Sequence, residues 1–373
     1  MAVPNRLKTL REERGWTQVK VRQQIRLFAL AKGVSVANSD SLKAMYSGWE
    51  NKHHLPDAHY RELLCLVFGV PESQLLGAGG GPSEEDDPAS ELRRRLLVSG
   101  ATDSATVALF QAQTDRIRMI DRRMGARASA DQMAAHLASL QTQLSHTVFL
   151  DQRRPLAVVL SDAAALAAWQ ALDLGDVSSA WQHYETAKAA REAESRTLLA
   201  HAMASQAYVV LDLNQPQLGL DLVREACAIA GSSVPALLSS WLRAVEAELC
   251  AAAGLRRDCY HGFDEAARRL PPDVEDPELP YLMLSDGHLS RWRGNAFAKL
   301  GDDRAIDELY AALNDTAPTS ARAEASLRCD LAHVLMVAGH RDEARIQADK
   351  AAELVALLGS VRQRRRLARV RAA

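Results

Sequence analysis

The sequence has little of what disulfide-bonded, zinc-binding or membrane-spanning proteins require. Its five cysteines are odd in number and scattered, and no two of them form a Cys-x-x-Cys pair. The sequence therefore predicts neither a disulfide framework nor a zinc site. It contains no run of 18 or more consecutive apolar residues, which argues against a membrane span. The polar N-terminus lacks the apolar core of a secretory signal, so we expect a cytoplasmic protein.

Motifs of enzyme chemistry are also missing. The glycine-rich "GAGGG" at 77–81 lacks the Gly-Lys-Ser/Thr ending of a phosphate-binding loop, and no strand pattern precedes it. We find no GxSxG nucleophile elbow, no HExxH zinc motif and no paired carboxylates in a pocket-like context. The sequence therefore predicts a protein that is not an enzyme and that needs no cofactor.

At 373 residues the chain is too long for one ordinary core, and its charge is unevenly distributed. Residues 1–81 carry 11 Lys/Arg and 7 Asp/Glu, a net charge of +4. Residues 82–91 add five acids and no base, and the remainder is nearly neutral at −1. A mildly basic head, an acidic connection and a neutral body favour contact with nucleic acid at one end only.

One stretch divides the chain. Leu75–Ser90 contains four glycines, two prolines and a run of acids, a composition that cannot build a core. Helical periodicity precedes this stretch, and a region rich in alanine and leucine, without convincing strand alternation, follows it. We predict an all-α protein with four parts: a head at 1–77, a flexible linker at 78–91, connecting or capping helices at 92–160 with a break at 125–129, and a repeat region at 161–373.

The repeat region places a turn residue after each of five helical stretches, at spacings of 39, 40, 47 and 38: Gly175, Asn214, Gly254, Gly301 and Gly339. A small residue stands seven positions before each turn: Ala168, Ala207, Ala247, Gly294 and Ala332. A mostly small residue stands five positions after it: Ala180, Gly219, Cys259, Ile306 and Ala344. Seven positions after that residue stands an alanine in four segments, at Ala187, Ala226, Ala266 and Ala351. The fourth segment departs from the pattern, with Ile306 at the small position and Leu313 in place of this alanine. Small residues at these places let two helices approach closely.

Four positions after the small residue that follows each turn, three of the five segments carry an aromatic residue: Tyr184, Phe263 and Tyr310. This order of small, turn, small and aromatic residues resembles the tetratricopeptide repeat over residues 161–358. The resemblance implies five helix pairs stacked as a solenoid, with repeats longer than the usual ~34 residues. A generic alanine-rich helix bundle is the alternative. Stacked helix pairs form a concave surface that holds peptides or dimerises. The candidates for lining it are His183, Tyr184, Tyr208, Trp241, Tyr281, Trp292 and Arg293.

The sequence of the head predicts four helices followed by a short closing segment. Leu7 and Leu10 predict a first helix over about 4–14 that ends at Gly15. Thr17 is a good N-cap for a second helix that reaches Lys32. A loop at 33–40 offers Asn38, Ser39 or Asp40 as the next cap. The third and fourth helices are expected over about 41–51 and 57–69.

These elements carry a specific set of marks: "LREERGWTQ" at the start, Trp49-Glu50 late in the third helix, Pro56, and "VFGV…LLG" at the end. Together they resemble the XRE-type helix-turn-helix family of transcription regulators over residues 4–77. With the repeats, the chain resembles actinobacterial regulators of this type that carry a tetratricopeptide-like C-terminal half. Two departures stand out. Gln18 and Glu50 are separated by 31 residues, roughly twice the separation in compact members, and Lys52 stands where glycine is frequent.

The third helix supplies the candidate contacts to DNA bases. Its outward-facing residues are short or basic, as base readout in the major groove requires: Lys43, Ala44 and Ser47. The resemblance places Gln18 and Asn51 at phosphates. Residues 52–54 follow the helix where the DNA backbone would pass, which adds three phosphate-contacting candidates: Lys52, His53 and His54. The plainer alternative is a solvated helix face.

The two histidines also raise the question of a metal site. Adjacent histidines point in different directions on most backbones, and His59 is the nearest candidate for a third ligand. We therefore predict no metal site. Trp49 is expected in the core of the head, and Glu50 is expected to pair with an arginine, either Arg6 or Arg11.

Two functional hypotheses follow. In the first, the protein is a sequence-specific transcription regulator that binds a double-stranded DNA operator in the nucleoid. The repeat region would form a homodimer and sense a peptide or small-molecule signal. In the alternative, the repeats form an interaction scaffold and the head is vestigial. The six arginines of residues 362–373 fit a solvated end of the last helix, at its negative pole, better than a nucleic-acid contact.

Overall fold

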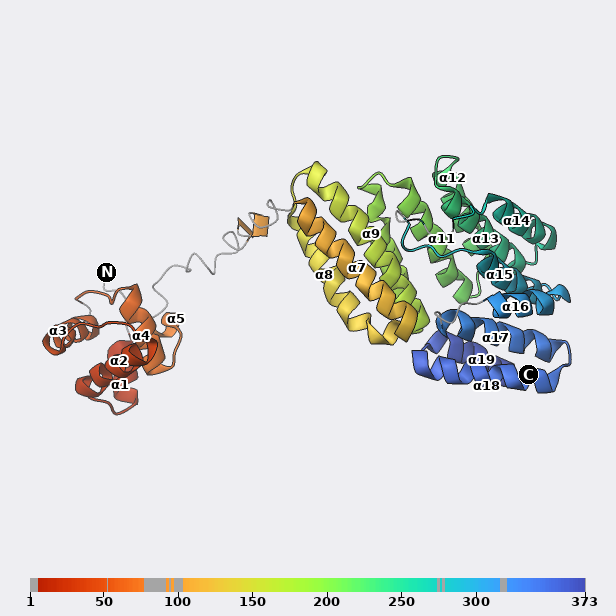
Figure 1. Cartoon of the computed structure of the whole chain (residues 1–373). Helices are drawn as coiled ribbons and strands as arrows, with labels where there is room; N and C mark the ends of the chain where they lie inside the picture. The colour runs from red at the N-terminus through yellow and green to blue at the C-terminus, as the bar shows by residue number, and fades with distance from the viewer. Residues whose placement is uncertain are drawn as a thin grey trace. The chain divides into compact units, whose positions relative to one another are not determined.

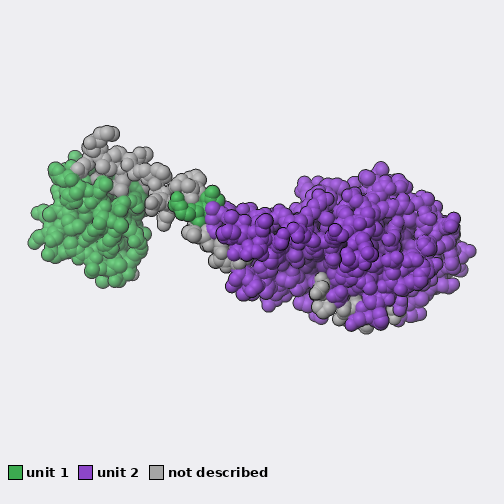
Figure 2. All heavy atoms as spheres, turned by 90° about the horizontal axis from the view of Figure 1, so that it is seen from above, with its two compact units in different colours: residues 1–94 green, residues 95–373 purple. Residues whose placement is uncertain are grey.

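The computed structural model describes residues 6–51, 53–76, 92–93, 95–96, 103–273, 276, 279–315 and 321–372. The chain divides into two compact units, an N-terminal unit of residues 1–94 and a repeat unit of residues 95–373 (Figure 2). All regular structure in these described ranges is helical (Figure 1), which confirms the all-α prediction. The predicted linker at 78–91 lies outside the described residues.

The N-terminal unit consists of α1 (Leu7–Glu13), α2 (Gln18–Lys32), α3 (Ser39–Glu50), α4 (Ala58–Phe68) and α5 (Glu72–Leu76). Side chains cap three of these helices, because Thr17, Asn38 and Asp57 each accept a hydrogen bond from a backbone N–H three residues later. The expected helices are confirmed. The third begins earlier than expected, because Asn38 is the cap among the three candidates.

The core of the N-terminal unit is built around α3. Trp49 and Tyr46 are almost fully buried, and the Trp49 ring lies 5.0 Å from the ring of Tyr60 on α4. Leu42, one and two turns before them on α3, is also buried. The expected core position of Trp49 is confirmed. One face of α3 is therefore committed to the core, and the opposite face is left for solvent.

The repeat unit begins with α7 (Ser104–Met124), the short η1 (Ala126–Ala128) and α8 (Ala130–His146). Five helix pairs follow (Figure 1): α9 (Leu150–Asp173) with α10 (Val177–Ala187), α11 (Arg196–Asp212) with α12 (Pro216–Ala230), α13 (Ala236–Ala252) with α14 (Arg256–Arg269), α15 (Asp286–Lys299) with α16 (Arg304–Asp315), and α17 (Ala321–Val337) with α18 (Arg341–Leu358). The last helix is α19 (Val361–Ala372), and η2 (Lys188–Arg191) extends α10. The predicted break at 125–129 coincides with η1, whereas α9 runs across the predicted boundary at residue 160.

All five predicted turn residues join the two helices of a pair, and all five have left-handed backbones: Gly175 (φ 81°), Asn214 (60°), Gly254 (77°), Gly301 (64°) and Gly339 (84°). Glycine, and less readily asparagine, adopts this conformation without a large penalty. The small residues seven positions before the turns are buried in all five pairs. The prediction of five helix-pair repeats is confirmed.

The interpretation of the fourth repeat is wrong in one respect. Ile306 and Leu313 are only half-buried, and the buried residues lie one position earlier, at Ala305, Leu309 and Ala312. Helix α16 begins three positions after Gly301, one later than the second helices of the other pairs. Its first buried small residue, Ala305, nevertheless stands four positions after the turn instead of five, so the small-residue pattern is shifted rather than lost. Gly294 fits this register, because a Cβ atom there would lie 2.6 Å from Cγ of Leu309.

Helix α9 is long and apolar enough, by length and composition, to cross a membrane, although the chain has no unbroken apolar run of that length. Its most apolar 18-residue window has a mean hydropathy of 1.4, and 72% of that window is buried inside the protein. The helix packs against α7, α8, α10 and α11. Its apolar character therefore matches its place in the core of the repeat unit.

The two ends of the helical array meet. Helix α7 packs on α17, and α19 packs on α9. Arg322 on α17 forms an ion pair with Asp121 on α7 at 2.8 Å, and the Ser360 hydroxyl donates to Asp173 at the end of α9 at 2.7 Å. Gly125 sits against the backbone carbonyl of Leu358, where a Cβ atom would collide. The repeat unit is thus closed into a ring.

The arginine-rich end is not simply a solvated helix terminus, and this interpretation needs correction. Leu367 and Val370 are buried in a cluster with residues of α17 and α18. Arg362 makes two hydrogen bonds of 2.8 Å to Asp212, and Arg366 pairs with Asp330. Arg362 thus fastens α19 to the distant α11, and Arg366 fastens it to the neighbouring α17, because the chain turns back at Gly359 and Ser360.

Candidate functional site

The closed array surrounds a cavity of about 470 Å³. Its wall comes mainly from the first helices of the five pairs, together with α7, α19 and the segment 281–283. The second helices of the pairs contribute little to the wall of the cavity, to which α10 contributes Tyr184. A volume of this size is typical of a small-molecule site.

Aromatic rings form one wall of the cavity. The His201 ring lies 4.3 Å from the Tyr281 ring and 5.0 Å from the Trp241 ring, and Trp241 meets Trp292 edge-on at 6.5 Å. Burial, and to a lesser extent the charge of Arg118, lowers the pKa of His201 to about 3. His201 is therefore a neutral ring at physiological pH.

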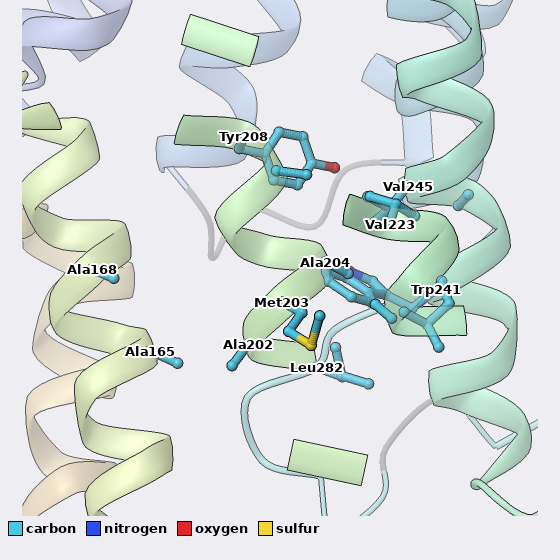
Figure 3. Close-up of a cluster of buried hydrophobic side chains, with 14 of the residues drawn as sticks. Ala165, Ala168, Ala202, Met203, Ala204, Tyr208, Val223, Trp241, Val245 and Leu282 are labelled. Carbon is cyan, nitrogen blue, oxygen red and sulfur yellow. The ribbon is translucent and has the colours of Figure 1, made fainter. Parts of the chain in front are cut away.

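The aromatic wall continues into the core of the repeat unit. Figure 3 shows Tyr208 on α11 and Trp241 on α13 in the same cluster as the small residues Ala165 and Ala168 of α9. Tyr208 and Trp241 keep 8% and 7% of their surface exposed, and both reach the cavity. Because these rings are packed on one side by the core, they form a rigid surface toward the cavity.

Charged side chains form the rest of the wall. Eight Lys/Arg and six Asp/Glu line the cavity. Most of them are paired with one another across different helices: Arg118 with Asp162, Arg322 with Asp121, Arg362 with Asp212, Lys299 with Glu248, and Arg366 with Asp330. Three of the pairs join neighbouring helices, and Arg322–Asp121 and Arg362–Asp212 join helices far apart in the sequence, so the pairs stabilise the closed form. They leave an excess of positive charge in the wall.

Glu248 shows how tightly these carboxylates are held. Burial acts to raise its pKa, but the positive charge of Lys299 and hydrogen bonds from Tyr208 and Lys299 lower the pKa below its ordinary value. Tyr208 donates to one carboxylate oxygen at 2.9 Å, and Lys299 donates to the other at 3.2 Å. Glu248 is thus ionised and fully engaged at neutral pH.

The cavity prediction succeeded for aromatic residues and missed the charged ones. Five of the seven candidates line the cavity: Tyr184, Tyr208, Trp241, Tyr281 and Trp292. His183 and Arg293 do not, and Arg293 instead pairs with Glu308 on α16 at 2.7 Å. Asp162 and Glu248 were missed. For Asp162 the signal was an isolated carboxylate within a long apolar stretch of helix, which is costly unless a cation is nearby. Glu248 has another acid, Glu246, two residues before it and gave no such signal.

The N-terminal unit holds the predicted DNA contacts. Lys43 and Ala44 are exposed on α3, and Ser47 is half-buried on the same face. Asn51, the C-cap of α3, donates from its side chain to the Ser47 carbonyl at 2.9 Å. The remaining candidates differ: His53 and His54 are exposed, the His54 ring lies over Gly48, and Lys52 lies outside the described residues.

Glu50 is the polar centre of the N-terminal unit. Its side chain is 2% exposed and accepts hydrogen bonds from Arg11 Nε at 2.5 Å, the Gln18 amide at 2.6 Å and the Tyr46 hydroxyl at 2.9 Å. Burial acts to raise the Glu50 pKa, but these three hydrogen bonds hold it below its ordinary value. Of the two predicted arginine partners, Arg11 is the one observed.

This network changes the picture of Gln18. It occupies the first position of α2, as expected, but its side-chain amide is held by Glu50 rather than free to reach a phosphate. Sequence reasoning missed Gln18 and Tyr46 as partners of Glu50. Tyr46 could have been found, because it stands one helical turn before Glu50. The network connects α1, α2 and α3 and fixes the orientation of α3.

Nothing in the described part of the chain brings three or more His, Cys, Asp or Glu side chains into a group that could hold a metal ion. His59, the third ligand considered, instead contacts the Ser35 carbonyl at 3.1 Å. All five cysteines are free thiols.

Comparisons with known proteins add little to this geometry. No protein-family description matches the chain, and no curated protein does. Among solved structures, the TPR domain of P58(IPK) aligns over 95% of this chain and 98% of its own, with 16% sequence identity and a TM-score of 0.27. A superposition this loose leaves the repeat architecture resting on the helix pairs and turns described above.

Proposed function

We propose that this protein is a helical-repeat interaction protein in which the repeat unit associates with other molecules. The observation that supports this proposal is the shared orientation of the first helices, which direct aromatic and charged side chains toward one cavity. Stacked helix pairs bind their partners through such surfaces. A peptide or small-molecule signal and a second copy of the chain are the partners we expect.

Self-association is the part of this proposal that can be tested without knowing the signal. Val148, Phe149 and Leu150 are consecutive and 64%, 62% and 69% exposed between α8 and α9. Exposed apolar groups gathered in this way mark association surfaces. We expect the full chain to form a dimer in sedimentation equilibrium, and Phe149→Asp to weaken the dimer at least ~10-fold, or ~1.4 kcal/mol.

Leu213→Asp is the matched control, because Leu213 is 57% exposed elsewhere in the repeat unit. Aspartate at position 149, the N-cap of α9, also favours the helix that follows. A monomeric wild-type chain would contradict the proposal, as would equal effects of the two substitutions.

A second function is favoured by the surface of α3. Its buried face and the Glu50 network hold the helix rigidly, while Lys43, Ala44 and Ser47 lie on its other side. These are side chains suited to base edges in the major groove. We therefore propose that the N-terminal unit binds double-stranded DNA, and that the whole protein is a sequence-specific transcription regulator whose two DNA-binding units are linked by a dimer.

The test is recovery of genomic DNA fragments by the purified full chain, followed by titration of a recovered fragment. Affinity should fall steeply as salt rises, because phosphate contacts release counterions. Lys43→Ala with Ser47→Ala should lower specific affinity by ~10-fold or more, since a good base contact contributes ~1–3 kcal/mol.

Lys8→Ala with Thr9→Ala likewise removes one lysine and one hydroxyl residue, from the exposed face of α1, and should leave affinity nearly unchanged. Binding that is absent, or insensitive to salt, would overturn the DNA proposal. If Lys43→Ala with Ser47→Ala leaves function intact while changes in the repeats abolish it, the protein is a scaffold with a vestigial head.

A further inference from the structure

The cavity of the repeat unit contains a cation that forms no ion pair with the surrounding carboxylates in the described parts of the chain. Arg291 lines the cavity from α15, and within the described parts of the chain it makes no hydrogen bond or ion pair. Its Nε atom is buried without a partner. Burial also lowers the pKa of Arg291, which means that the protein compensates its charge poorly.

The two carboxylates that act most strongly on the charge of Arg291 are Asp330 and Glu248, and both already have other partners. Asp330 accepts from the Asn295 amide at 2.6 Å and pairs with Arg366, and Glu248 accepts from Tyr208 and Lys299. A half-buried guanidinium whose Nε has no partner and which has no anionic partner is costly to the empty protein. A group of this kind in a cavity is a candidate for binding a ligand.

Other polar atoms of the same cavity are also left without partners. In the described residues, the Tyr281 hydroxyl and the Asn295 amide oxygen are buried and make no hydrogen bond. Asn295 stands one helical turn after Arg291, so both side chains face the cavity from one side of α15. A polar ligand would satisfy these groups together.

The aromatic wall of the cavity indicates that the part of the ligand away from its polar group is a ring. Trp241, Trp292, Tyr281 and the neutral ring of His201 present π faces and edges within one connected cluster. Rings of this kind bind planar, apolar groups by stacking and edge contacts. The wall is preformed, because Trp241 is packed by the core on its other side.

We propose that the cavity of the repeat unit binds a small planar organic anion, with its acidic group at Arg291 and its ring against Trp241 and Trp292. The acidic group is a carboxylate, sulfonate or phosphate, all of which a guanidinium recognises through paired hydrogen bonds. This inference deepens the proposed interaction role of the repeat unit and names the chemical class of its ligand.

The test uses two fluorescent probes that share a ring system and differ in charge. 1-Anilinonaphthalene-8-sulfonate carries a sulfonate, and N-phenyl-1-naphthylamine is its neutral counterpart. We expect the full wild-type chain to bind one sulfonate probe per chain, at least ~10-fold more tightly than the neutral probe, because a charge-assisted pair contributes more than ~1.4 kcal/mol. Arg291→Gln should abolish this preference and leave binding of the neutral probe unchanged.

Arg291→Lys keeps the charge and should retain part of the preference. Arg345→Gln, which removes an exposed arginine of the same unit, should retain all of it. Melting followed by circular dichroism should show that Arg291→Gln is folded and no less stable than wild type, since it removes an uncompensated charge.

Equal affinity for the two probes would overturn the proposal, as would an unchanged sulfonate preference in folded Arg291→Gln. A failure of the anion-binding proposal can be distinguished from a failure of the proposed self-association. Sedimentation of the wild-type and Phe149→Asp chains measures self-association without any ligand.

Discussion

Arg11→Ala is expected to destabilise the N-terminal unit by ~3 kcal/mol, because it leaves the Glu50 carboxylate buried without its cation. The loss lies at the lower end of the range for buried pairs, since the Arg11 side chain is 14% exposed whereas that of Glu50 is 2% exposed. Hydrogen exchange of peptides from α3 and α4 in the full chain would measure this loss separately from the repeat unit.

Two further variants make the test specific. Arg26→Ala removes an exposed arginine from α2 and should cost little. Arg11→Met with Glu50→Leu removes both charges and should recover much of the stability lost in Arg11→Ala. If Arg11→Ala and Arg26→Ala have the same effect, the pair does not hold the helices of this unit together.

The same pair gives the N-terminal unit a defined response to acid. The Glu50 pKa lies below its ordinary value in the folded state. Its contribution to stability is therefore complete above the unfolded pKa of ~4.3 and is lost as the pH falls through the lower folded pKa. The N-terminal unit of Arg11→Ala should lose less stability than the wild-type unit over that acid range.

Gly125→Val is expected to open the ring of the repeat unit. Gly125 has φ 84° and ψ 168°, a conformation that is almost confined to glycine, and a Cβ atom would collide with the Leu358 carbonyl. Backbone strain of ~1–3 kcal/mol and a similar packing penalty give a total of ~3–5 kcal/mol. Faster hydrogen exchange in α19 and at the end of α7, together with a lower melting temperature, would show the opening.

Gly254→Val separates the effect of backbone strain from the effect of the collision with Leu358. Gly254 also has a left-handed backbone, φ 77°, but its Cβ position is open within 4 Å. That variant should show backbone strain alone, without faster exchange in α19. Gly125→Val should also weaken binding of the sulfonate probe, because α7 and α19 both line the cavity. Equal losses in the two glycine variants would mean that the contact with Leu358 does not hold the ring closed.

Much of the local structure was predictable because its causes lie within a few residues. Thr17 and Asp57 cap their helices through bonds to N–H groups three residues away. The left-handed turns at Gly175 and Asn214 follow from the residues themselves. The fourth repeat was misaligned because its first buried small residue stands four positions after the turn glycine instead of five, a shift that leaves the composition unchanged.

The candidate site divides in the same way. The outward side of α3 could be read from the spacing of Leu42, Tyr46 and Trp49. The partner of Glu50 could only be narrowed to two arginines, because the choice depends on how α1 packs against α3. Gln18 was assigned to phosphate, and its hydrogen bond to Glu50 spans 32 residues of sequence.

The amino-acid sequence alone predicts that this protein is helical, that its second part is built from five helix pairs, and where each pair turns. These features follow from periodicity, caps and the backbone freedom of single residues. The closed ring, the cavity and the unpaired Arg291 were decided only by the tertiary structure. Small rotations between successive pairs accumulate until Arg322 meets Asp121 across 201 residues and Arg362 meets Asp212 across 150. Because the total rotation depends on every pair in the array, no short sequence pattern predicts it.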